Sequence, residues 1–280
     1  MTATDTTPTR SAAPQLPSVF KLGLMRARIE ILSFFRLKQQ LVFTFLLPVL
    51  LLVIFGSAFS SNKMPGNITF AQYFTAGMIA SGIVYTAFQN LGIAIPEERQ
   101  DGTLKRLGGI PMPKLAYFLG KVGQVAFAYV GQTAILLIIG RLFFKVHLPT
   151  TATQWWTFTW ISVMGLATWT LLGIAISVVP KNARSASAVI TPIVLVLQFI
   201  SGVFFVFAQL PKWMQDVASI FPLRWMTQGM RSVFLPDSFK AQEVGGHWQL
   251  GTVAIMLAIW IVIGLVCSIA FFRWIPKSQR

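Results

Sequence analysis

Charged residues are scarce in this chain. Asp, Glu, Lys and Arg together make up 11% of its 280 residues, against about 25% in ordinary soluble domains. A soluble protein of this length needs a charged exterior, and too few charges are present to build one. A soluble protein with a large all-helical core is therefore strongly disfavoured.

The shortage of charge is concentrated in six segments that contain no Asp, Glu, Lys or Arg. These are residues 41–59, 73–95, 122–140, 157–179, 189–208 and 250–272. Each holds 19 to 23 residues, and a helix needs about 20 to cross the hydrocarbon core. Because backbone amides in lipid must bond within their own segment, we expect helices. The prediction is an all-α integral membrane protein with six transmembrane helices.

All eight carboxylates lie outside these segments. Carriers driven by protons or sodium usually keep an ionisable group inside the membrane, so such a carrier is disfavoured. Backbone carbonyls of broken helices can also bind sodium, and a stand-alone carrier or channel therefore stays as an alternative. The only cysteine, Cys267, excludes an intramolecular disulfide. His147 and His247 stand in separate loops, and no metal site is expected.

Motifs for catalysis and nucleotide binding are missing from the sequence. No G-x-x-x-x-G-K-[ST] loop occurs, since Gly120-Lys121 is followed by Val122 and lacks the upstream glycine. Neither a G-x-S-x-G turn nor an H-E-x-x-H pair is present. We therefore expect no catalytic residue and no cofactor in this chain. Uphill transport would need an energy source in another subunit.

The net charge of +15 does not indicate nucleic-acid binding, because of where the basic residues lie. If the six segments alternate in direction, loops 1–40, 96–121, 180–188 and 273–280 share one side of the membrane. They carry 16 of the 23 Lys and Arg residues. The positive-inside rule then places both termini in the cytoplasm, with basic side chains facing anionic lipid headgroups.

The two ends of the chain are predicted to lie outside the membrane domain, which spans residues 18–272. Residues 1–17 are rich in Thr, Ser, Ala and Pro, which predicts a disordered tail, and residues 273–280 form a short C-terminal tail. Residues 18–40 mix basic and apolar residues and predict an interfacial helix. Its apolar stripe consists of Leu22, Met25, Ile29 and Leu32.

The predicted outer segment 209–249 is the least regular part of the chain. Charged residues interrupt it, and a charge at the membrane midplane costs about 2.5–3.5 kcal/mol. A seventh crossing is therefore disfavoured, and short amphipathic or re-entrant helices at the outer interface are expected. Pro48 and Pro192, inside the first and fifth segments, are candidate kinks.

The inner loop 96–121 holds eight charged residues in 26 positions. A loop so charged meets water or a protein partner. Its acids come before its bases, which suits a short helix. Asp101-Gly102 could instead mark a turn between two short helices.

This loop resembles the signature of ABC-2 type transporter permeases, especially their drug-exporter branch. Glu97 is followed after four residues by Gly102-Thr103-Leu104, and then by Leu107, Pro111 and Gly120-Lys121. The resemblance extends over residues 18–272. It includes Phe55-Gly56, Pro180-Lys181-Asn182, Ser201-Gly202-Val203-Phe204-Phe205 before Leu210-Pro211, and Phe221-Pro222-Leu223 leading to Arg231.

The resemblance implies a permease subunit in the bacterial cytoplasmic membrane. In the family, this loop forms a cytoplasmic coupling helix that sits in a groove of a separate ATP-binding subunit. Two such subunits, which bind ATP and Mg, and a second permease, identical or related, are the implied partners. The implied coupling residues are Glu97, Glu98, Gly102, Thr103, Lys105 and Arg106. The acids would pair with bases of the partner, and Gly102 would permit close backbone approach.

The resemblance also implies a substrate pathway at the permease dimer interface, lined by the second and fifth helices. These helices offer Phe88, Gln89, Asn90, Gln198, Phe199 and Phe204. Uncharged amide and aromatic groups suit an amphipathic or lipid-like cargo, such as a drug or antibiotic. The amides could equally hold helices together by hydrogen bonds. Export of polysaccharide or cell-envelope lipid is the alternative within the same architecture.

Overall fold

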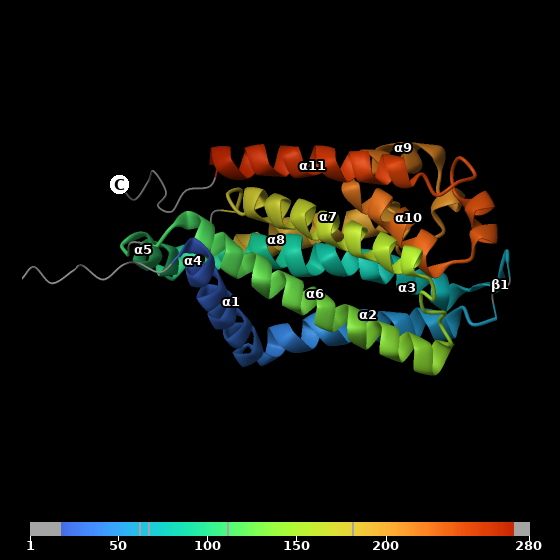
Figure 1. The fold of residues 1–280 in the computed structure, drawn as a ribbon, viewed down its shortest axis with the longest axis horizontal. Coiled ribbons are helices and arrows are strands. Elements are labelled where there is room, and N and C mark those ends of the chain that lie inside the picture. Colours follow the sequence, from blue (N-terminus) through green and yellow to red (C-terminus); the bar gives the residue numbers. More distant parts are fainter. Residues whose placement is uncertain (1–17, 62, 67, 111, 181, 272–280) are drawn as a thin grey trace, which may run out of the picture.

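The computed structural model describes residues 18–61, 63–66, 68–110, 112–180 and 182–271. Within them the chain is almost entirely helical, with one short two-stranded hairpin (Figure 1). The tails expected at 1–17 and 273–280 lie outside the described residues, as do Pro111 and Lys181 of the expected motifs.

The elements follow one another along the chain as a series of long and short helices. They are α1 (Val19–Arg36), α2 (Lys38–Ala58), β1 (Lys63–Met64), β2 (Ile68–Thr69), α3 (Phe70–Ile83), η1 (Val84–Gln89), α4 (Asn90–Gln100), α5 (Thr103–Gly108), α6 (Lys114–Phe144), α7 (Ala152–Ile176), α8 (Ala183–Ile200), η2 (Phe207–Gln209), α9 (Lys212–Ile220), α10 (Pro222–Phe234), η3 (Asp237–Gln242) and α11 (Leu250–Phe271). The strands β1 and β2 pair antiparallel. η1 is a π-helical segment between α3 and α4.

Five helices among the described residues are long and apolar enough to cross a membrane. They are the continuous helix Phe70–Gln100, formed by α3, η1 and α4, together with α6, α7, α8 and α11. α2 carries a shorter apolar stretch, Thr44–Ala58, at the place of the first predicted segment. The prediction of an all-helical membrane protein is confirmed, with five helices that meet the length and composition of a span.

The prediction for the fifth segment, residues 189–208, is wrong at both ends. α8 starts at Ala183 and ends at Ile200. Gly202 has a φ of 76°, a left-handed conformation that ends the helix. The carbonyl of Ser201 then accepts a hydrogen bond from Thr227 Oγ1 at 2.7 Å. Most side chains of residues 201–208 are packed inside the protein, although Phe205 and Ala208 are exposed. A run without charges therefore does not by itself show that the helix continues.

The long helices other than α1 run roughly along the long axis of the molecule, α1 runs obliquely to it, and the short elements gather at its two ends (Figure 1). One end, called here the elbow end, carries α5 with the adjoining ends of α4 and α6. The other, called the hairpin end, carries β1, α9 and α10. The helix Phe70–Gln100 is the most buried of the five candidate spans, and α11 is the least buried. The central helix therefore connects the two ends through the core.

α1 packs against α6 with very little space between the two helices. A Cβ atom added at Gly123 would lie 2.7 Å from the Cβ of Ala27. The predicted stripe of α1 faces away from this contact, since Met25 and Ile29 are 50% and 52% exposed. The helix expected over residues 18–40 is thus confirmed for α1, which ends at Arg36. Its buried face consists of Gly23, Ala27, Glu30 and Phe34.

We expect the substitution Gly123→Val to push α1 away from α6. Overpacking of this kind costs about 1–3 kcal/mol, so thermal unfolding of the purified protein in detergent should begin at a lower temperature. Gly251→Val is the matched control, because a Cβ at Gly251 meets nothing within 4 Å. Equal loss of stability in the two variants would contradict the close α1–α6 contact.

Candidate functional site

The elbow, residues 96–121, contains the end of α4, the short helix α5 and the first residues of α6, with a turn between α4 and α5. α4 ends at Gln100, and Asp101 Oδ1 accepts a hydrogen bond from the backbone N–H of Thr103 at 2.8 Å. Gly102 has a φ of 77°, a conformation that costs other residues roughly 1–2 kcal/mol. The alternative of a turn at Asp101-Gly102 is therefore the one observed, and α5 begins directly after it.

The tip of the elbow presents charges to its surroundings. Glu97, Lys105 and Arg106 are exposed, whereas Leu104 is fully buried and anchors α5 against the bundle. Arg106 Nη2 donates to Thr103 Oγ1 at 3.0 Å, which holds the side chain along the outside of α5. A partner protein could thus reach both acidic and basic groups here.

Glu98 points into the protein, in contrast to its neighbour Glu97. Its carboxylate forms an ion pair with Lys121 of α6, and its Oε2 accepts a hydrogen bond from the hydroxyl of Tyr117 at 2.7 Å. Lys121 Nζ also lies 2.9 Å from Glu30 Oε2 in α1. The Glu98 carboxylate therefore has its partners within its own chain. Its placement does not support the expected pairing with basic residues of a partner protein.

The two residues after Glu98 connect the elbow to the opposite side of the bundle. Arg99 Nη1 donates to the carbonyl of Ser177, directly after α7, at 3.3 Å. Gln100 Oε1 accepts from the backbone N–H of Ala183, the first residue of α8, at 2.9 Å. The turn between α7 and α8 is thereby joined to the end of α4.

The expected pathway residues lie along the central helix, in α8 and, for Phe204, just beyond α8, and only some of them contact one another. Gln89 Nε2 donates to Thr191 Oγ1 at 3.4 Å, and Tyr85 OH donates to Gln198 Oε1 at 3.0 Å. Gln89 and Gln198 therefore both occupy the contact between η1 and α8, called here the η1–α8 seam. Among the described residues, Gln198 Nε2 is buried without a hydrogen-bond partner.

The aromatic members of the expected set are dispersed. Phe88 packs edge-on against Trp169 of α7, with ring centroids 5.4 Å apart. Phe204 lies beyond the end of α8, and its ring centroid is 5.0 Å from that of Phe199. The Phe199 side chain is 41% exposed. Asn90 is half-buried. The structure thus separates Phe88 from the seam that holds the two glutamines.

The π-helical turn explains why the seam exists at the level of Tyr85 and Gln89. A π-helical turn accommodates one extra residue, shifts the following side chains around the helix and often occurs at functional sites. On its other side, η1 is pressed against Gly173 of α7, where an added Cβ would lie 2.9 Å from the carbonyl oxygen of Ala87. The backbone irregularity is thus packed on one side and bonded to α8 on the other.

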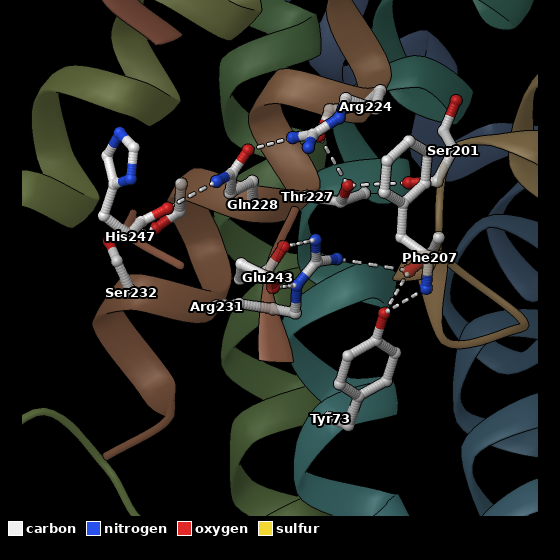
Figure 2. A network of polar contacts seen from close by, with 12 residues as sticks. Tyr73, Ser201, Phe207, Arg224, Thr227, Gln228, Arg231, Ser232, Glu243 and His247 are labelled. Atoms are coloured by element: carbon white, nitrogen blue, oxygen red, sulfur yellow. Dashed lines mark hydrogen bonds and ion pairs between the residues drawn. The ribbon is translucent and has the colours of Figure 1, made fainter. Parts of the chain in front are cut away.

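A buried ionic network holds the hairpin end (Figure 2). Arg231 of α10 forms a bidentate ion pair with Glu243, with 2.9 Å between Nη2 and Oε2 and a second contact from Nε. Arg231 Nη1 donates to the carbonyl of Gly202 at 3.4 Å. The hydroxyl of Tyr73 accepts from the backbone N–H of Phe207 at 3.2 Å. These contacts join α10, α3 and the segment after α8.

Arg224 lies near the start of α10, before Arg231 in the same helix. It takes part in none of the ion pairs found among the described residues. It is 2% exposed, and its Cζ lies 4.3 Å from the ring centroid of Phe207. Its guanidinium donates to Gln228. Burial, together with repulsion from Arg231, lowers the pKa of Arg224 to about 10. The group stays positively charged at neutral pH, so the network carries one cation more than its single anion, Glu243.

The model of the ABC-2 family transporter protein matches residues 65–270, from the hairpin to the end of α11. This chain belongs to that family. It is 26% identical over 212 residues to the inner membrane transport permease YadH of Escherichia coli (strain K12), which covers 74% of this chain and 80% of the relative. YadH of Shigella flexneri matches with the same values. The ycf38 protein of Porphyra purpurea, whose name also describes a transport permease, is 24% identical over 228 residues, 78% of this chain and 77% of its own length.

Sequence reasoning missed the partners that hold the two ends of this ABC-2 family protein. In the sequence, Lys121 is the last cation before the third apolar segment, and Glu30 is the only acid between residues 18 and 40. Nothing in the sequence indicated that they meet, because 91 positions separate them. Arg231 and Glu243 were likewise read as residues of an irregular outer loop.

We expect Glu243→Gln to destabilise the hairpin end strongly. Burial alone would lower the pKa of Arg231, but the attraction of Glu243 outweighs it and raises that pKa above its ordinary value. Without the carboxylate, two buried guanidinium groups lack a counter-charge, and breaking a buried pair costs about 3–5 kcal/mol. The apparent melting temperature of the purified protein should fall accordingly.

Asp216→Asn provides the control for this measurement, because Asp216 pairs with Lys212 at the surface and its side chain is 62% exposed. Surface pairs contribute about 0–1 kcal/mol. A melting temperature of Glu243→Gln as high as that of Asp216→Asn would show that the buried pair does not stabilise the fold.

Proposed function

We propose that this protein is the membrane-spanning permease subunit of an ATP-driven exporter. In this proposal, ATP is hydrolysed by two separate ATP-binding subunits, and a second permease completes the transport unit. Membership of the ABC-2 family supports a transport role. The name of the relative YadH, an inner membrane transport permease, supports a place in a bacterial cytoplasmic membrane.

The observation that carries the proposal is the combination of an exposed, charged elbow with a sequence that has no nucleotide-binding loop. α5 is anchored by the buried Leu104 and exposes Lys105 and Arg106. Such a tip can dock into a groove of another protein, and the contacts of Arg99 and Gln100 would pass its movement to the helices. Energy released elsewhere thus has a physical route into the bundle.

The elbow residues divide into two roles under this proposal. Glu97, Lys105 and Arg106 are exposed and would contact the ATP-binding subunit, together with the half-buried Thr103. The left-handed turn at Gly102 sets the direction of α5. Glu98 would act from within the permease.

The orientation in this proposal puts the elbow in the cytoplasm and the hairpin end outside, with six crossings and α2 as the first. The excess of Lys and Arg in loops on the elbow side supports it. The cargo is an amphipathic or lipid-like compound, for which the amides of Gln89 and Gln198 at the η1–α8 seam offer polar contacts. The unpartnered Nε2 of Gln198 supports that choice, since a buried amide without a partner is costly.

The docking role of the elbow is tested by reversing its two exposed cations. We expect Lys105→Glu combined with Arg106→Glu to abolish co-purification with the ATP-binding subunit and ATP-dependent export. Insertion into the membrane should be unchanged, because both side chains are exposed. The readouts are the ATPase activity and the subunit composition of the purified complex.

Lys212→Glu is the control, since this lysine is also exposed but lies in α9 at the hairpin end. Export by the doubly reversed variant at the rate of the unchanged protein would overturn the docking role. Concentration of a solute by the purified chain alone in sealed vesicles, without ATP, would support a stand-alone carrier instead.

A further inference from the structure

Four charged residues, two of them buried and two half-buried, join three elements just inside the elbow. Glu98 of α4 pairs with Lys121 of α6, Lys121 pairs with Glu30 of α1 at 2.9 Å, and Glu30 lies 2.5 Å from Arg26 of the same helix. Tyr117 closes the group by donating its hydroxyl to Glu98. We call Arg26, Glu30, Glu98 and Lys121 the ion quartet.

The ion quartet is electrically balanced and largely closed to water. It contains two cations and two anions, and the exposed fractions of the side chains are 14% for Arg26, 8% for Glu30, 17% for Glu98 and 2% for Lys121. Charges inside a protein are tolerated only when each has a partner. Separating Glu98 from Lys121 would leave the Glu98 carboxylate without an ionic partner, while Lys121 would keep Glu30, so the elements that carry Glu98 and Lys121 are expected to stay together.

Apart from the ion quartet, α1 is held near the elbow chiefly by α6, against which it packs closely. Its packing against α6 uses small residues such as Ala27 and Gly123, and its exposed stripe faces away from the bundle. Leu37 separates it from α2 by a break in the helix. Within the described residues, the ion pairs that link α1 to other elements run through Lys121.

Three consecutive residues at the end of α4 therefore bond in two directions. Glu98 reaches α6 and, through Lys121, α1. Arg99 and Gln100 reach the turn between α7 and α8. A displacement of the elbow is thereby divided between the α1–α6 pair and the α7–α8 turn.

We propose that Lys121, together with Glu30 and Glu98, makes α1 move as one body with the elbow during transport. Lys121 is a positioning residue in this scheme: it has no contact with cargo or nucleotide and acts by joining two acids from different helices. The inference rests on the proposed function in one respect: an ATP-binding subunit must bind the elbow and displace it. The link itself is a property of this chain.

The test uses a double variant that cuts the link without leaving an unpaired charge. Glu98→Gln combined with Lys121→Gln removes one anion and one cation and keeps the Arg26–Glu30 pair, four residues apart in α1. Glu30→Gln, which removes the acid on the α1 side, is the second variant. Asp216→Asn, an exposed carboxylate at the hairpin end, is the control for loss of a negative charge.

The first measurement needs only the full chain in lipid nanodiscs. Hydrogen exchange of the amides in α1, followed by mass spectrometry, should speed up several-fold in the double variant and in Glu30→Gln. It should stay unchanged in Asp216→Asn, as should exchange in α11 in all variants. Unchanged exchange of α1 in the double variant would overturn the link, whichever subunits bind the protein.

The second measurement uses the complex with its ATP-binding subunits and compares export with ATP consumption. The double variant should still bind these subunits and hydrolyse ATP, while the amount exported per ATP falls by about 2- to 30-fold, the range for substitutions along a coupling network. A merely structural defect would lower hydrolysis and export together. An unchanged ratio overturns the positioning role of Lys121. Failure of the unmodified chain to bind any ATP-binding subunit would instead overturn the proposed function, and the exchange result would still decide the link.

Discussion

Buried charge is the constraint on which this structure depends. A membrane bundle offers no water to an ion, so a charged group within the protein needs a partner of opposite charge or a set of hydrogen bonds. The protein meets this requirement at its two ends, with the ion quartet near the elbow and the Arg231–Glu243 pair near the hairpin. Both clusters join residues that are distant in the sequence, and both close an end of the bundle.

The two clusters differ in balance. The ion quartet has equal numbers of cations and anions, whereas the hairpin-end network has Arg224 in excess over Glu243. Stacking on aromatic rings and a bond to Gln228 stabilise that additional cation. The ion quartet near the elbow therefore has no net charge. The hairpin end is held together by dense packing around two buried arginines.

Between these ends, the polar groups are uncharged. Tyr85, Gln89 and Gln198 meet where the central helix changes to π-helical geometry. An amide or hydroxyl is tolerated in an apolar bundle at a lower cost than an ion, provided that it finds a hydrogen bond. The seam therefore combines uncharged polar contacts with an irregular helical turn that is packed against Gly173 of α7.

Composition alone was enough to predict a helical membrane protein, because long stretches without charge can only be satisfied by helices in lipid. The charges that interrupt the apolar chain in the elbow predicted a loop that meets water or a protein partner, and its docking role stays a prediction. Local chemistry also left open the turn at Asp101-Gly102, which the structure has. Hydropathy failed at residues 201–208, most of which are buried in the protein beyond the end of α8, because burial inside a protein and burial in lipid favour the same apolar residues.

The sequence by itself determined which segments are apolar, where the charges lie and which family the elbow resembles, because these are properties of neighbouring residues. Only the tertiary structure decided that Glu98 faces inward beside Tyr117 and that Glu30 reaches Lys121. It also decided that α10 inserts its arginines into the bundle. An ion pair between two helices forms only if the helices pack at the right height and each is rotated so that its charged side chain faces the other. The residues of a single helix determine neither condition.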